Sequence, residues 1–96
     1  MIVKLARYQV RKDALPQTLQ LVHAFVDEVT RKEGGTARYE AFQAKDDPTR
    51  FTHYMTFRTP AADQYHQKTA WAKRFFEALA PLCVAAPSVE ELTPVP

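Results

Sequence analysis

Glycine occurs only twice in the 96 residues, as the adjacent pair Gly34 and Gly35. A phosphate-binding loop needs several glycines at fixed spacing, because the backbone must approach the phosphate closely. The sequence therefore contains no Walker-type or dinucleotide-binding loop. Cysteine is scarcer still, since the single Cys83 excludes an intramolecular disulfide. We expect this thiol, late in an apolar helix, to be a small buried hydrophobic group rather than a nucleophile.

Long apolar runs and blocks of one charge are absent as well. No stretch approaches the ~20 apolar residues of a membrane span, and the first residues do not have the pattern of a signal peptide. The 13 basic and 11 acidic residues alternate along the chain and leave a net charge of +2, without the basic cluster of a nucleic-acid-binding protein. We therefore expect a cytoplasmic protein whose partners include neither a membrane nor a nucleic acid.

The residues that are present suffice for one small globular domain. Hydrophobic residues make up 46% of the chain and aromatic residues 11%, which is ordinary for a folded domain and too apolar for disorder. A chain of this length forms one domain, residues 1–96, with a thin core. His23, His53 and His66 fall on three different predicted elements without ligand-like spacing, so we predict no metal site.

Local patterns predict four strands and three helices. Strands are indicated by β-branched and aromatic residues over residues 2–10, 36–44, 51–58 and 88–92. Helices are predicted from Asp13, as N-cap, to about Lys32, and over residues 61–67 and 70–82. We expect Gly34 and Gly35 to end the first helix in a left-handed cap. Residues 45–50 should form a turn that is longer than a two-residue hairpin.

The resulting order, β-α-β-β-α-β with a split second helical region, is that of the α+β ferredoxin-like fold with an antiparallel sheet. The first three strands carry apolar or aromatic residues on both faces. The helices can cover only one face, so we expect the sheet of a second copy to cover the other in a homodimer.

His53 and Tyr54 are neighbours in the third strand, and their side chains must therefore point to opposite faces of the sheet. If the face of His53 meets the helices, His53 lines a pocket and Tyr54 meets the partner sheet. The reverse arrangement fits the pattern equally well, so both remain open.

Several short motifs together resemble those of the antibiotic biosynthesis monooxygenase family. In chain order they are Arg38-Tyr39-Glu40, Asp47-Pro48-x-Arg50-Phe51, Tyr54, His66 and Thr69-x-Trp71-x-Lys73. The resemblance covers essentially the whole chain. It implies a dimeric α/β barrel, the fold of relatives that include quinol monooxygenases and an autoinducer-2 processing enzyme.

The resemblance also implies a function. Family members without a cofactor oxidise phenols or hydroquinones with molecular oxygen, so we expect a cofactor-independent monooxygenase acting on a small aromatic or quinol-like ligand. His66 matches the recurrent histidine of the family and would be the general base. Tyr39 and Tyr54 match family aromatics that hold substrate, while His53 and Trp71 would shape the pocket. From residue identity alone, His66 is more often a helix-surface histidine than a base, and the tyrosines are more often apolar rings with a hydroxyl at the sheet edge than substrate contacts.

Two positions depart from the family pattern. Met55 stands where many relatives carry an acidic residue, and Phe76 stands where haem-degrading relatives carry a histidine ligand, so haem degradation is not expected. One alternative is a ligand-binding or stress-associated dimer without catalysis. Another is a processing enzyme for a small phosphorylated signal molecule, in which Arg38, Arg50 and Arg58 would matter more than the aromatic residues.

Overall fold

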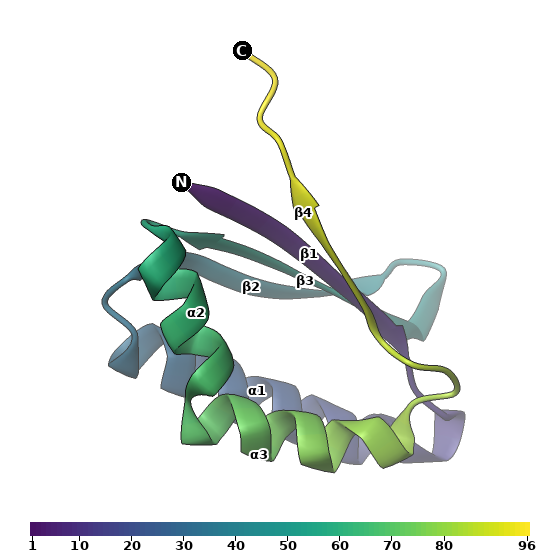
Figure 1. The fold of residues 1–96 in the computed structure, drawn as a ribbon. Coiled ribbons are helices and arrows are strands. Elements are labelled where there is room, and N and C mark those ends of the chain that lie inside the picture. The colour runs from purple at the N-terminus through teal and green to yellow at the C-terminus, as the bar shows by residue number, and fades with distance from the viewer.

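A computed structural model describes all residues 1–96 and has the predicted order of elements (Figure 1). The strands are β1 (Ile2–Gln9), β2 (Thr36–Ala44), β3 (Asp47–Phe57) and β4 (Ser88–Leu92). The helices are α1 (Leu15–Lys32), α2 (Pro60–Lys68) and α3 (Ala70–Leu79), with short 3-10 turns η1 (Lys12–Ala14) before α1 and η2 (Ala80–Leu82) after α3. The predicted ferredoxin-like α+β fold is confirmed. No helix is both long enough and apolar enough to cross a membrane.

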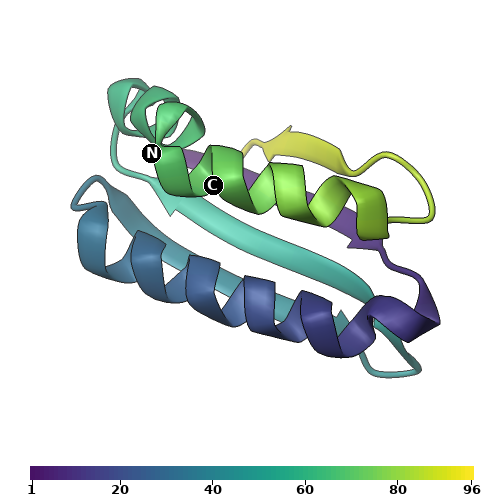
Figure 2. The same ribbon diagram turned by 90° about the horizontal axis from the view of Figure 1, so that it is seen from below.

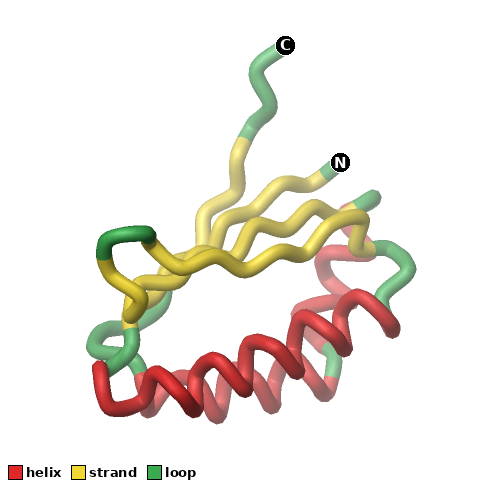
Figure 3. The backbone as a smooth tube through the Cα atoms, turned by 180° about the vertical axis from the view of Figure 1, so that it is seen from behind, coloured by secondary structure: helices red, strands yellow, loops and turns green.

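The four strands form one antiparallel sheet in the order β2-β3-β1-β4, with β1 and β3 at its centre. All three helices cover the same face, where α1 and α3 run side by side (Figure 2). The opposite face carries no helix (Figure 3). This arrangement decides the orientation of β3: His53 packs against the helices with 1% of its surface exposed, and Tyr54 points to the open face.

The core lies between the sheet and the pair α1 and α3. Phe25 of α1 stacks on Phe75 of α3 with ring centroids 4.3 Å apart, and Val29 and Leu79 are almost fully buried beside them. The apolar stripes of the two helices thus meet each other as well as the sheet. This packing places α2, which connects β3 to α3, across one end of the sheet (Figure 1).

The loop between β2 and β3 is shorter than we expected. Ala44 pairs with Asp47, so the loop contains only Lys45 and Asp46, and the predicted long turn over residues 45–50 is wrong. The reason is that this segment pairs with both neighbouring strands: Gln43 pairs with Phe51, Gln9 pairs with Arg50, and the Thr49 carbonyl accepts from the Val10 N–H at 3.0 Å. This pairing outweighs the local turn contact, in which the Asp47 carboxylate accepts from the N–H and the hydroxyl of Thr49 at 3.0 and 2.6 Å.

Both predicted caps of the first helix are also wrong. Asp13 belongs to η1, and the N-cap position of α1 is occupied by Ala14, which has no side-chain cap. Neither glycine has a positive φ angle, because the chain leaves α1 at Glu33 in an extended conformation. Gly35 is required for a different reason, its close packing against α2.

Candidate functional site

A cavity of about 340 Å³ lies between the helix-facing side of the sheet and the helices α2 and α3. Its wall is largely apolar and includes Ala6, Met55, Ala72, Phe75 and Leu79. A smaller group of polar side chains converges on the same space: Lys4, Tyr8, Tyr39, His53, Asp63, His66 and Gln67. An apolar cavity with a few converging polar groups is the usual form of a small-molecule site.

His66 of α2 is held from one side by Glu33. Its Nδ1 lies 2.8 Å from Oε1 and 3.0 Å from Oε2 of the carboxylate, and both side chains are buried. A carboxylate at this position favours the tautomer with hydrogen on Nδ1, which leaves Nε2 with a free lone pair. Nε2 makes no hydrogen bond with the protein. It also keeps some accessible surface, because the only fully buried side-chain polar atom that lacks a partner is Oγ1 of Thr56. His66 therefore presents a basic nitrogen to the cavity.

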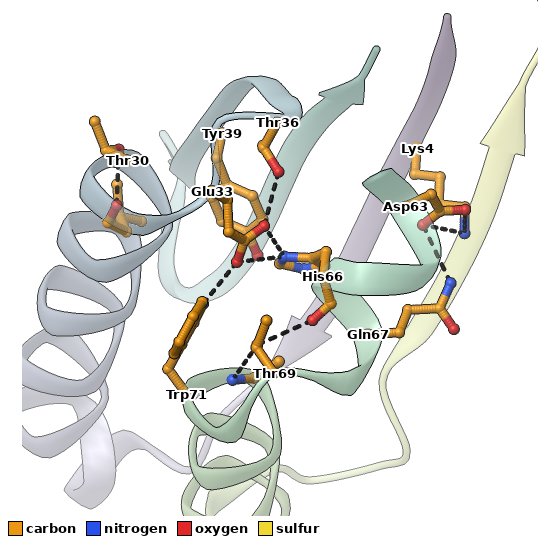
Figure 4. A network of polar contacts seen from close by, with 12 residues as sticks. Lys4, Thr30, Glu33, Thr36, Tyr39, Asp63, His66, Gln67, Thr69 and Trp71 are labelled. Carbon is orange, nitrogen blue, oxygen red and sulfur yellow. Dashed lines mark hydrogen bonds and ion pairs between the residues drawn. The ribbon is translucent and has the colours of Figure 1, made fainter. Parts of the chain in front are cut away.

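Glu33 is itself fixed by two further donors. The indole Nε1 of Trp71 donates to Oε2 at 2.6 Å, and the hydroxyl of Thr36 donates to Oε1 at 2.7 Å (Figure 4). The three partners come from α2, the start of α3 and the start of β2, so the carboxylate joins all of them. Hydrogen bonds of this kind replace the hydration that a buried carboxylate loses. Glu33 thus orients the imidazole of His66.

A second polar group, separate from this pair, consists of His53 between two tyrosines. The hydroxyl of Tyr8 lies 2.7 Å from Nε2 of His53, and the hydroxyl of Tyr39 lies 2.8 Å from Nδ1. Burial lowers the pKa of His53 to about 4, so its imidazole is neutral at neutral pH. Burial also raises the pKa of both tyrosines, which therefore keep their protons. All three side chains line the cavity and carry no charge.

The remaining charged groups of the cavity wall neutralise each other. Lys4 Nζ lies 2.7 Å from Oδ2 of Asp63, and the two side chains are 16% and 13% exposed. Gln67 donates to the same carboxylate at 3.1 Å. No arginine lines the cavity.

The structure brings some of the residues singled out from the sequence together and separates others. His66, His53 and Tyr39 line the cavity. Trp71 does not line it and instead holds Glu33 behind His66. Tyr54 lies on the open face of the sheet, with its ring 5.7 Å from the guanidinium of Arg38.

Sequence reasoning missed five polar residues of the site: Lys4, Tyr8, Glu33, Asp63 and Gln67. Glu33 lies 33 positions from His66, and no local pattern marks the pair. For Tyr8 the alternation of β1 was a usable signal, because it places Tyr8 on the same face of the sheet as Ala6, which pairs with His53. Tyr8 could have been assigned to the cavity only if the sequence had shown that the face of His53 meets the helices.

The comparison with protein families gives a direct result. The sequence model described as antibiotic biosynthesis monooxygenase matches residues 1–78, which run from β1 almost to the end of α3. The chain belongs to the antibiotic biosynthesis monooxygenase family. The matched segment of this family member contains every polar residue of the cavity wall, as well as Glu33 and Trp71.

Several solved structures have the same fold as this family member. An antibiotic biosynthesis monooxygenase superposes with a TM-score of 0.93 at 23% identity and covers 100% of both chains. A candidate antibiotic biosynthesis monooxygenase from Nitrosomonas europaea gives 0.92 at 22% identity, with 99% of both chains covered. Rv0793 from Mycobacterium tuberculosis gives 0.89 at 21% identity, covering 99% of this chain and 95% of its own. At these identities the similarity shows the fold. A search of curated proteins found no significant match.

Met55 and Phe76, the two positions that we expected to depart from the family pattern, both lie at the cavity. Met55 is 5% exposed and forms part of the apolar wall, whereas Phe76 is 48% exposed. Nowhere in the structure do three or more His, Cys, Asp or Glu side chains form a group that could hold a metal ion. The side chains of the cavity therefore offer one basic imidazole, one uncharged hydrogen-bonded triad and one ion pair.

Proposed function

We propose that this family member is a cofactor-independent monooxygenase that oxidises a small aromatic or quinol substrate with molecular oxygen. One observation carries the proposal: His66 lines a largely apolar cavity of about 340 Å³, with Nδ1 bound to Glu33 and Nε2 without a partner in the protein. A base beside an apolar cavity is what this chemistry requires from the protein.

The reaction begins with removal of a hydroxyl proton from the quinol by Nε2 of His66. The resulting anion is electron-rich and passes one electron to oxygen, giving a semiquinone radical and superoxide. These two combine by forming a bond between oxygen and a ring carbon that carries hydrogen, and His66 returns its proton to the peroxide. The hydroperoxide then loses water, which takes up the hydrogen of that ring carbon, and a carbonyl group is left. One oxygen atom enters the substrate and the other leaves as water. The substrate supplies all the electrons and both hydrogens of that water, so no further reductant is needed.

The surroundings of His66 suit this step. Glu33 stabilises the imidazolium that forms when His66 takes the proton, as a buried carboxylate on the far nitrogen of a catalytic histidine does elsewhere. The apolar wall at Met55 and Phe75 excludes water from the radical pair and provides a surface for an aromatic ring. Tyr39 and His53 lie in the same wall and are the proposed substrate contacts.

We further propose that the protein acts as a homodimer. On the open face of the sheet Val3, Leu5 and Tyr54 are only half-buried by their own chain, although two of the three are aliphatic. Covering this face with the same face of a second copy would remove these side chains from water. Tyr54 would then lie in the interface rather than in the cavity.

The phosphorylated-substrate alternative receives less support from the site. The only lysine of the cavity wall is paired with Asp63, and Arg38, Arg50 and Arg58 are exposed outside it. A non-catalytic ligand-binding protein would have the same cavity, and only a measurement of turnover separates it from an oxygenase.

Oxygen uptake by the chelator-treated protein with a panel of hydroquinones tests the proposal. We expect uptake above the autoxidation blank and a loss of at least about tenfold in His66→Ala. His23→Ala is the matched control, because His23 is exposed on α1 and does not line the cavity. Unchanged turnover in His66→Ala would remove the proposed base. Tight binding of a hydroquinone without uptake would favour the non-catalytic alternative.

A further inference from the structure

The triad of Tyr8, His53 and Tyr39 holds more protons than its hydrogen bonds use. A neutral imidazole carries one N–H and one lone pair, and each phenol carries one O–H. The three side chains therefore have three protons, but they form only two hydrogen bonds with one another. Neither tyrosine hydroxyl has another partner in the protein. One proton of the triad is left over.

The position of the leftover proton follows from the two ring nitrogens. Whichever nitrogen carries the hydrogen donates it to one tyrosine, and the other nitrogen accepts from the other tyrosine. The tyrosine that accepts from His53 then has its own O–H free. In both tautomers the spare donor is thus a phenol hydroxyl, never the imidazole, which is 1% exposed.

A spare donor in an apolar cavity is costly unless it meets an acceptor. An unsatisfied hydroxyl that is shielded from water loses about 1–3 kcal/mol relative to a paired one. Tyr8 is 7% exposed and stacks flat on Phe51 with ring centroids 5.2 Å apart, so its ring cannot turn outward. Tyr39 is fixed edge-on to Phe25 at 5.4 Å. No protein acceptor reaches the spare O–H, so its acceptor in the cavity is either water or an oxygen atom of a ligand that displaces the water.

We propose that Tyr8, His53 and Tyr39 together form the subsite for an oxygen atom of the ligand, a carbonyl or a phenolate, which accepts the spare tyrosine O–H. His53 is a positioning residue, because it touches the tyrosines and fixes which one donates. The inference rests on the proposed substrate cavity, but it adds Tyr8 and the chemical class of the recognised group. It also gives the proposed reaction a donor for the anion that His66 creates and for the carbonyl that forms.

Isotope-edited infrared spectroscopy of a bound aryl ketone tests this subsite without any turnover. The probe is carbonyl-labelled 1-indanone, an inert bicyclic ketone that the cavity can hold, since a cavity of ~150 Å³ already accepts benzene. In the wild-type protein we expect the carbonyl stretch to lie at lower frequency than in an apolar solvent, because the carbonyl accepts a hydrogen bond. The shift should disappear in the double variant Tyr8→Phe/Tyr39→Phe.

Affinity provides the second readout. The double variant should bind indanone roughly two- to tenfold more weakly while its affinity for indane, the matching hydrocarbon, stays the same. Tyr65→Phe is the matched control, because Tyr65 is 55% exposed on α2 and its hydroxyl makes no hydrogen bond. If the double variant does not fold, the two single variants replace it: a lost or altered shift in Tyr8→Phe or in Tyr39→Phe supports the proposal, and a shift identical to that of the wild type in both overturns it.

Three results would overturn the subsite: no binding of indanone, binding to the wild type without a shift, or the same shift when neither tyrosine hydroxyl is present. These outcomes are independent of the oxygenase proposal. A shift without oxygen uptake retains the subsite and rejects the oxygenase, whereas uptake without a shift does the reverse.

Discussion

A Cβ atom on Gly35 would lie 2.5 Å from the Cβ of Ala62. The backbone between α1 and β2 thus touches the first turn of α2 directly, and the carbonyl of Gly35 also accepts a hydrogen bond from the N–H of Arg58 at 2.8 Å. Glu33 and His66 lie on the two segments that meet here. The close approach therefore sets how the carboxylate and the imidazole face each other.

Gly35→Ala should accordingly disturb both stability and the site. The added methyl group meets a helix rather than a flexible side chain, so we expect a loss of about 1–3 kcal/mol in the free energy of unfolding. Gly34→Ala is the control, since no atom lies within 4 Å of its Cβ and its φ is not positive. Urea unfolding of both variants checks this. Equal free energies of unfolding for Gly35→Ala and Gly34→Ala would show that α2 shifts to accommodate the methyl group without a loss of stability.

Glu33→Gln tests the orienting carboxylate while keeping its shape. The amide retains one oxygen acceptor, but it has no charge to stabilise an imidazolium, and its single oxygen can no longer serve His66, Trp71 and Thr36 as two carboxylate oxygens do. We expect the rate of quinol oxidation to fall at least about tenfold. Glu28→Gln is the control and should retain the wild-type rate, because Glu28 is partly exposed on α1, pairs with Lys32 and Arg74, and does not line the cavity. A fully active Glu33→Gln protein with an unchanged circular dichroism spectrum would contradict the role of Glu33.

Stability should fall with decreasing pH because of His53. Its pKa of about 4 in the folded protein lies below the ordinary value of 6.5. Between these two pH values the unfolded chain binds a proton that the folded protein does not, so acid favours unfolding. The contribution of neutral His53 to the free energy of unfolding is complete above about pH 6.5 and decreases towards pH 4. In total it amounts to roughly 3 kcal/mol.

The measurement for His53 is the free energy of unfolding from pH 7 to pH 4.5, compared between the wild type and His53→Gln. The amide of Gln can donate and accept but does not titrate in this range. Carboxylates affect both proteins alike, so the difference between the two curves isolates residue 53. Parallel curves would show that His53 titrates normally in the folded state.

The open face of the sheet should hold two chains together. We expect light scattering to give the mass of a dimer at micromolar concentration. Leu5→Glu should shift the protein towards the monomer, because it places a charge in the middle of this face. Leu19→Glu, at a 43% exposed position on α1, should leave the mass unchanged. A monomeric wild-type protein would exclude the dimeric α/β barrel.

The elements of the fold could be predicted because their signals are local. A stripe of apolar residues at helical spacing marks α1, and alternation marks β1 and β3. The errors fall at the ends of elements. Residues 47–50 contain Pro48 and two polar neighbours and were interpreted as a turn, but they pair with β2 and β1 and therefore belong to the strand. How far a strand extends depends on the length of the strands beside it, which the local residue pattern does not specify.

The candidate site was only partly predictable for a related reason. His66, His53 and Tyr39 were named from the family resemblance, and they line one cavity. Tyr54 was named with them, but the alternation of β3 puts it on the other face once His53 faces the helices. Trp71 was expected to shape the pocket, whereas the structure shows its indole bound to a carboxylate behind it.

The sequence by itself determined the number, type and order of the elements and the family. It also determined that His53 and Tyr54 point to opposite sides of a sheet. All of these depend on periodicity and short motifs, which are properties of neighbouring residues. Only the tertiary structure decided which side faces the helices, that Glu33 meets His66 and Trp71, and that His53 joins Tyr8 to Tyr39. Those contacts link residues far apart in the chain, and they arise from the packing of α1, α2 and α3 on a single face of the sheet.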